Sequence, residues 1–148
     1  MNQGQRLAEI SKMVRESSLK RFRQVQPPNR GWRPREDMLT FVDVLKHLVD
    51  ADLWLFSLLE GYPKHRADIK PGEAHAADWD RHFAHLELLG KKRAEKLSLL
   101  SDEDLARPIV EPEILGDTDW GTLIMRGCLD HEAHHRGSLQ VMLRLKYG

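Results

Sequence analysis

The sequence predicts an all-α fold, an antiparallel four-helix bundle with one long crossover connection. Apolar residues recur every three or four positions through four long segments, which is the period of an α-helix with one buried face. No stretch alternates apolar and polar residues for long enough to build a sheet. Proline, glycine and capping residues separate the segments, so each segment has a defined start and end.

The first two predicted helices cover residues 5–24 and 34–61. The first carries its apolar residues on or near one face, and it ends before a proline pair at Pro27 and Pro28. The second begins at Pro34, which favours the first turn of a helix, and acidic residues follow as the helix dipole prefers. A glycine and a proline close it, which predicts an unusually long helix.

A third helix is predicted over residues 76–100, where apolar residues again mark one buried side. Ser101 then has an acidic residue three positions later, the pattern of a capping box, and this pattern predicts one short helical turn. Residues 109–116 are expected to form an extended connection. The last helix is expected to begin at a cap on Asp117 or Thr118.

Length and composition predict one soluble domain over residues 1–148. Hydrophobic residues make up 41% of the chain and charged residues 31%, which suits a globule with a sizeable core. The formal net charge is zero, so no field would attract nucleic acid or an anionic membrane. A single cysteine and no apolar run of membrane-spanning length lead us to expect a cytoplasmic protein without membrane contact.

Two histidines in the last predicted helix have the spacing of a metal-binding pair. Residues four apart lie about 5 to 6 Å from each other on one helix face, so His131 and His135 can bind one ion together. Two imidazoles directed at an apolar core would each need a buried hydrogen-bond partner, and a shared metal ion removes that need. Their face is largely apolar and comprises Ile124, Cys128, His131, His135, Ser138, Met142 and Leu145.

A third ligand has to come from another helix, and His47 is the best candidate. It lies on an apolar face of the second predicted helix, one turn from Asp43 and one turn from Asp50. Either carboxylate can accept the second ring N–H of His47 and so orient it, and the alternative for both acids is an ordinary solvated surface.

The other histidines are less suited to a metal site. His82 and His85 flank the apolar face of the third helix, so we expect both on the surface. His65 and His75 fall in predicted loops, and His134 points away from the face shared by its two neighbours.

Glu132 and Cys128 are the weaker candidates for catalysis. The pattern His-Glu-x-x-His makes Glu132 the general base of a zinc peptidase, but the 13 residues after His135 contain no further His, Asp or Glu. Because Glu132 lies about 100° around the helix from His131, we expect it at the surface or at a dimer interface. Cys128 can act as a ligand or nucleophile, although a buried core position is the usual role of a single cysteine.

Some residues are assigned to packing. Gly137 interrupts the last helix, and we expect it to permit the close approach of another helix. Trp54 and Trp79 are expected in the core, whereas Trp32 and Trp120 lie near helix starts and can line a pocket.

The segment Asp130-His131-Glu132-Ala133-His134-His135-Arg136-Gly137 resembles the C-terminal motif of the DinB/YfiT-like metalloenzyme superfamily, and residues 45–52 with Trp54 resemble its second-helix motif. The resemblance extends over nearly the whole chain. It implies an antiparallel four-helix bundle of unusual connectivity, frequent homodimerisation, and a metal site made by His47, His131 and His135. Ser138 stands where members commonly have Gln, which affects no ligand.

Three imidazoles leave coordination positions open, which is typical of a catalytic site. Imidazole favours Zn or Ni and also accepts Fe and Cu. The resemblance implies a metal-dependent transferase in which a low-molecular-weight thiol attacks a small electrophile. Two alternatives stay open, a non-catalytic metal-binding stress or interaction protein and, with less support, a metal-dependent hydrolase.

Overall fold

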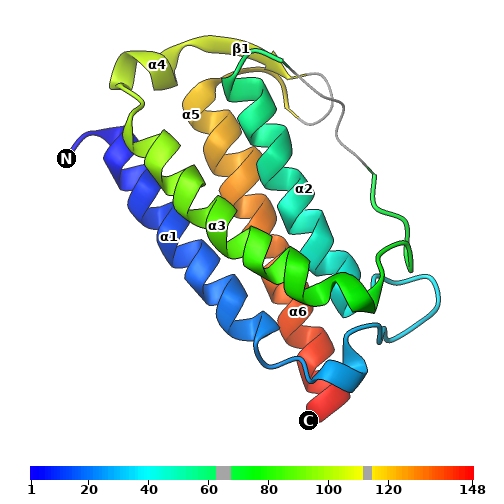
Figure 1. The fold of residues 1–148 in the computed structure, drawn as a ribbon. Helices are drawn as coiled ribbons and strands as arrows, with labels where there is room; N and C mark the ends of the chain where they lie inside the picture. Colours follow the sequence, from blue (N-terminus) through cyan, green and yellow to red (C-terminus); the bar gives the residue numbers. More distant parts are fainter. Residues whose placement is uncertain (63–67, 112–114) are drawn as a thin grey trace.

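The computed structural model describes residues 1–62, 68–111 and 115–148, and four long helices account for most of them. In Figure 1, α1 and α6 run in one direction along the molecule, whereas α2 and α3 run in the other. These four are α1 (Gln3–Phe22), α2 (Phe41–Leu59), α3 (Trp79–Ser98) and α6 (Asp130–Tyr147). The chain is therefore mostly helical, which confirms the all-α prediction apart from one small sheet.

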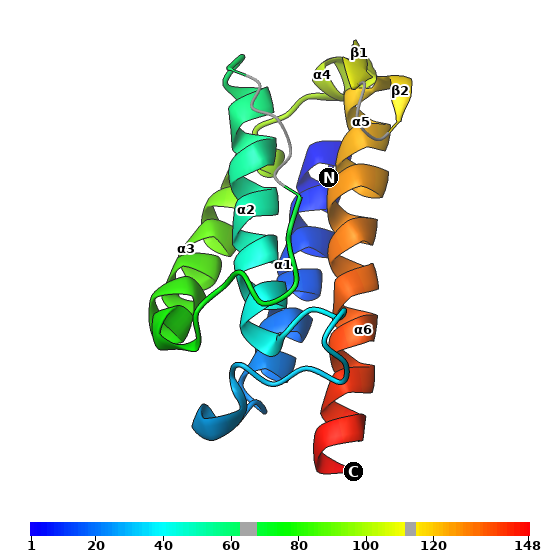
Figure 2. The same cartoon turned by 90° about the vertical axis from the view of Figure 1, so that its right-hand side faces the viewer.

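The last helical segment of the chain is longer than α6 alone. It begins with α5 (Trp120–Thr122), continues through the π-helix η3 (Leu123–Leu129) and then becomes α6, as the yellow-to-red ribbon of Figure 2 shows. A π-helix has a wider turn than an α-helix and is frequently found at functional sites. Here it lies directly before the histidine pair.

The remaining elements are short and connect the helices. They are η1 (Pro27–Asn29), η2 (Ala76–Asp78), α4 (Asp102–Ala106), β1 (Pro108–Glu111) and β2 (Gly116–Asp119). The two strands pair antiparallel from Pro108 opposite Asp119 to Glu111 opposite Gly116. The prediction of an extended connection without a sheet is wrong here, because each strand has only four residues and is too short to show an alternating pattern.

Capping contacts explain why the helices begin where they do. The hydroxyl of Thr40 accepts the backbone N–H of Asp43 at 3.0 Å, and the Asp43 carboxylate accepts the N–H of Thr40 at 2.8 Å. This capping box starts α2 after Thr40 and not at the predicted Pro34. Asp119 likewise caps α5, accepting the N–H of Thr122 at 2.7 Å, whereas the predicted caps were one and two residues earlier. The capping box at Ser101 is confirmed.

Of the residues that the sequence assigned to packing, the two core tryptophans lie where predicted and the glycine does not. Trp54 and Trp79 are buried in the core, as predicted. The prediction for Gly137 is wrong, because this glycine is exposed and a Cβ added there meets no atom within 4 Å. The close approaches occur at Gly4, where a Cβ would collide with the carbonyl of Leu100, and at Gly90, where it would collide with the side chain of Arg15.

The connection between α2 and α3 runs back along the molecule, since both helices point the same way (Figure 2). Its residues 68–75 are held to the start of α2, because the Asp43 carboxylate accepts the N–H groups of Gly72 at 2.7 Å and Ala74 at 2.9 Å. His65 lies outside the described residues. Among the helices of the described residues, none has both the length and the apolar content needed to cross a membrane.

Candidate metal centre

The structure brings together the three histidines that the sequence selected. His47 extends from α2, and His131 and His135 extend from α6. The Nε2 atom of His131 lies 3.1 Å from Nε2 of His47 and 3.0 Å from Nε2 of His135. One ligand atom from each ring lies within 4.8 Å of the other two, so the three rings form a group with the size of a metal site.

Hydrogen bonding among the rings cannot account for this convergence. An imidazole nitrogen carries either a proton or one lone pair, so Nε2 of His131 cannot bond well to both neighbours at once. A divalent cation, by contrast, takes one lone pair from each ring. Zinc–nitrogen bonds of about 2.0 to 2.1 Å in a tetrahedral site separate the nitrogens by about 3.3 Å. The observed separations of 3.0 and 3.1 Å are a few tenths of an ångström shorter, so the residues fit the ion.

The three histidines are half-buried, so the centre is not wholly enclosed by the protein. Beside His131 is a small cavity with room for about one water molecule, of roughly 10 Å³, lined by Cys128, His131 and Glu132 among others. Cys128 is buried, as expected for a core cysteine, and lies at the end of the π-helix. It lines the cavity beside His131 but is not part of the three-histidine group.

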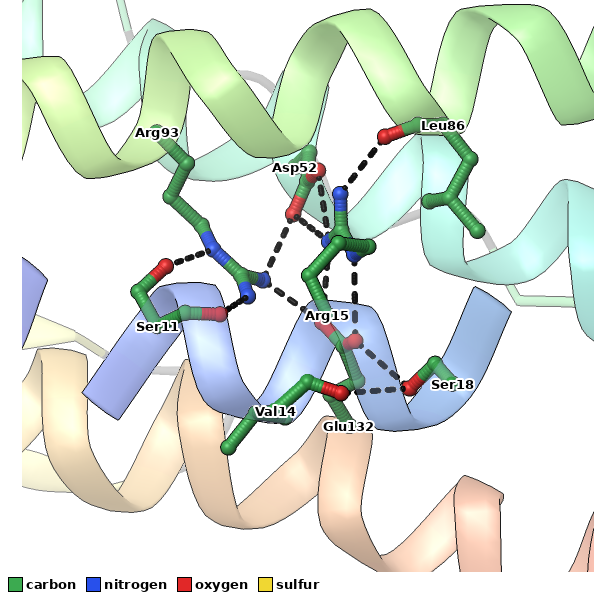
Figure 3. A network of polar contacts seen from close by, with 8 residues as sticks. All are labelled: Ser11, Val14, Arg15, Ser18, Asp52, Leu86, Arg93 and Glu132. Atoms are coloured by element: carbon green, nitrogen blue, oxygen red, sulfur yellow. Dashed lines mark hydrogen bonds and ion pairs between the residues drawn. The ribbon is translucent and has the colours of Figure 1, made fainter. Parts of the chain in front are cut away.

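Glu132 is not at the surface, and that prediction is wrong. Its side chain is 2% exposed, and its carboxylate accepts bonds from Arg93 at 2.7 Å, Arg15 at 2.8 Å and Ser18 at 2.7 Å. The turn of about 100° that separates it from His131 directs it into the bundle interior, where α1 packs against α6 and Arg93 reaches in from α3, and not towards solvent. Figure 3 shows the carboxylate enclosed by these three partners.

Asp52 completes a buried cluster of four charges that draws one residue from each long helix. Arg15 contacts its carboxylate at 2.8 Å and Arg93 contacts it at 3.0 Å. Arg93 also donates to the hydroxyl of Ser11 at 2.7 Å. We name Arg15, Asp52, Arg93 and Glu132 the charge cluster. Its side chains are at most 4% exposed and its formal charge is zero, as a buried ionic group requires.

Sequence reasoning missed the charge cluster, although a signal existed. Ser11, Arg15 and Ser18 lie at intervals of four and three residues and share the face of α1 that also carries Phe22. A polar stripe at helical spacing on an otherwise apolar face indicates a buried polar partner elsewhere in the chain.

The charge cluster fixes the ionisation of its members. Burial by itself would raise the pKa of Glu132, but Arg93 and Arg15, with hydrogen bonds from Arg15 and Ser18, lower that pKa to about 2. Burial opposes the charge of Arg15, yet Asp52 and Glu132 raise its pKa above the ordinary value. Glu132 is therefore an anion with both oxygens engaged, Oε1 by the two arginines and Oε2 by Arg15 and Ser18. A carboxylate so engaged is a poor general base.

The acids next to His47 have other partners. Asp43 is buried and accepts three backbone N–H groups, so the alternative of a solvated surface is wrong for this residue. Asp50 pairs with Lys46 at 2.9 Å. These contacts assign Asp43 to the start of α2 and to the connection that follows this helix.

The remaining histidines stay outside the centre. His82 is buried, which corrects its expected surface position, because α2 packs against the flank of α3 that carries it. Burial, followed by the charge of Arg81, lowers its pKa. His85 is half-buried, His75 is exposed in the connection before α3, and His134 is exposed on α6.

Comparison with known protein families identifies the family of this chain. The family model described as the DinB superfamily matches residues 12–139, a span that contains the three histidines and the whole charge cluster. None of the curated proteins matches the chain.

Proposed function

The chain belongs to the DinB superfamily, and on that premise we propose that His47, His131 and His135 bind one divalent transition-metal ion. The observation that carries this proposal is the convergence of the three Nε2 atoms from two helices. Zn and Ni are the metals we expect first, because imidazole suits both, and Fe and Cu are accepted by the same donors.

We further propose a thiol-dependent transferase reaction on a small electrophile. His47, His131 and His135 would hold a divalent cation, which would offer a coordination position to a small molecule and would lower the pKa of a thiol or water bound there. The thiol sulfur forms a bond to an electrophilic carbon, the leaving group departs with the electrons of its own bond, and the thiol proton passes to solvent. The half-buried rings support this reaction, since they are not wholly enclosed by the protein.

The charge cluster has a supporting part in this proposal. Glu132 follows His131 directly in the chain, and its bonds to Arg15 and Arg93 tie this turn of α6 to α1 and α3. The cluster thereby fixes the rotation of α6 about its own axis and its position along the bundle, so that His131 and His135 face His47. Glu132 itself takes no proton, which counts against the hydrolase alternative, because that mechanism needs it as a base.

One observation favours a second candidate function. Cys128 lines the same small cavity as His131, so a shift of its side chain would allow its sulfur to close the metal site. A closed site would make the protein a non-catalytic metal-binding stress or interaction protein.

Other expectations stay within this proposal. Superfamily membership and the directions of the helices support an antiparallel four-helix bundle in which the connection between α2 and α3 is the long crossover. A homodimer is proposed from the family resemblance of the sequence. A cytoplasmic location is proposed from the single cysteine, Cys128.

Cobalt(II) titration of metal-free protein separates the two functions. We expect the visible spectrum of a cobalt–imidazole site, and we expect a sulfur-to-cobalt charge-transfer band when 2-mercaptoethanol is added. The same band must form in Cys128→Ser, which lacks the internal thiol. A band that is present without added thiol and is lost in Cys128→Ser would instead identify the closed, non-catalytic site.

A further inference from the structure

A groove on the molecular surface begins at one of the three histidines. It lies between the segment before α2, the first turn of α2 and the outer face of α6, and its volume is about 420 Å³. His135 forms part of its wall, so the groove is continuous with the candidate metal centre. Its apolar lining consists mainly of Met38, Leu39, Val44, Val141, Met142 and Leu145.

The groove exposes large apolar side chains that the fold does not need at its surface. Met38 is 41% exposed, Val141 is 57% exposed and Leu145 is 63% exposed. Scattered exposed apolar residues need no explanation, but a contiguous apolar patch next to polar, metal-binding side chains marks a ligand or partner surface. Met38 and Met142 have flexible, polarisable side chains that adapt to ligands of different shape.

The charges around the groove indicate what it can accept. Among the described residues that line it there is no Lys or Arg, and the carboxylate among them, that of Asp37, is paired with Arg35 at 3.2 Å. The other ionisable lining residues are His134 and His135, both at the end near the centre. A phosphate or carboxylate group lying along the groove would therefore meet no unpaired lysine or arginine among the described lining residues, whereas an uncharged apolar group would lose water favourably.

We propose that this groove binds the uncharged, apolar part of the substrate, while the polar end of the same molecule reaches the three-histidine centre at His135. The volume is within the range of about 300 to 1,000 Å³ that small-molecule sites have. The substrate class is then an amphipathic small molecule with one polar, reactive end and an extended apolar body. This inference rests on the proposed metal-binding function.

A homologous series of alkyl hydroxamates on the cobalt-loaded protein tests the proposal, with affinity measured by calorimetry. Acetohydroxamate reports on the metal alone, because hydroxamates bind divalent metals through their polar end. Each added methylene group should tighten binding about fourfold until the groove is filled. Val141→Asp should remove this gain and leave the affinity for acetohydroxamate within twofold. The matched control is Leu88→Asp, since Leu88 is also an exposed residue within a helix but lies outside the groove, and it should keep the gain.

The possible failures are distinguishable. If acetohydroxamate binds and longer chains bind no tighter, the groove proposal is wrong and the metal site stands. If metal-loaded protein cannot be obtained, both proposals fall together. If sedimentation shows a dimer that Val141→Asp dissociates and Leu88→Asp does not, a second copy of the chain covers the groove and the substrate proposal is overturned.

Discussion

Neutralising Glu132 tests whether the charge cluster holds the fold together around the metal centre. In Glu132→Gln, the guanidinium groups of Arg15 and Arg93 keep only Asp52 as a counter-ion, so one positive charge stays buried without compensation. Breaking a buried ion pair in this way costs about 3 to 5 kcal/mol. The lowered pKa of Glu132, about 2 against an ordinary 4.5, leads to a similar value of about 3 kcal/mol.

The measurement is urea unfolding of metal-free protein, followed by far-ultraviolet circular dichroism in a chelating buffer. We expect Glu132→Gln to lower the free energy of unfolding by about 3 kcal/mol. The matched control is Glu95→Gln, because Glu95 is an exposed acid on α3, and it should change stability by less than about 0.5 kcal/mol.

A double variant separates loss of charge balance from loss of shape. Adding Arg93→Met to Glu132→Gln leaves Arg15 with Asp52, a neutral pair. The free energy of unfolding lost in the double variant should therefore be smaller, by at least about 2 kcal/mol, than the sum of the losses in the two single variants. Additive losses, or a loss below about 1 kcal/mol in Glu132→Gln, would refute the view that a balanced buried cluster stabilises the four helices.

Three further predictions follow from individual contacts. Because a Cβ at Gly137 meets no atom within 4 Å, Gly137→Ala should raise the free energy of unfolding by up to about 1 kcal/mol in the same urea assay, and a loss would indicate an unrecognised close neighbour. Asp43→Asn should cost about 1 to 2 kcal/mol and increase hydrogen exchange at the amides of Gly72 and Ala74, because the carboxylate accepts both; unchanged exchange would contradict its anchoring role. The pKa of Glu132 is lower in the folded protein, so the ionised carboxylate contributes its full stabilisation of the fold above pH 4.5. About 3 kcal/mol of the free energy of unfolding is lost as the pH falls towards 2. Urea unfolding at several pH values should find this acid-induced loss reduced in Glu132→Gln.

The features that could be predicted from the sequence are those that depend on the residues of one helix face. Helical periodicity located all four long helices, and the spacing of four residues placed His131 and His135 on one face. His47 was found because it is a histidine on an apolar face of another helix. The positions of the helices and the convergence of the three rings could be predicted because they depend on local period and residue type, which a single segment displays, whereas the role of the rings as metal ligands stays a prediction.

Tertiary partners explain what sequence reasoning missed. Glu132 was placed at the surface because its direction relative to His131 was known but the helix covering that direction was not. His82 was misplaced for the same reason, since α2 covers the flank of α3. The start of α2 was shifted because Pro34 is a weaker signal than the reciprocal cap between Thr40 and Asp43. In each case the deciding contact joins residues that the periodicity of one segment does not relate.

The central claim is the three-histidine metal site, and elemental analysis of untagged protein purified without added metal tests it most directly. We predict about one divalent transition-metal ion per chain, lost in His47→Ala, His131→Ala and His135→Ala. His134→Ala should retain the ion, because His134 is exposed on the same helix and lies outside the group. Metal that persists in His47→Ala while His131→Ala removes it, or protein that takes up no metal on reconstitution, would contradict the claim.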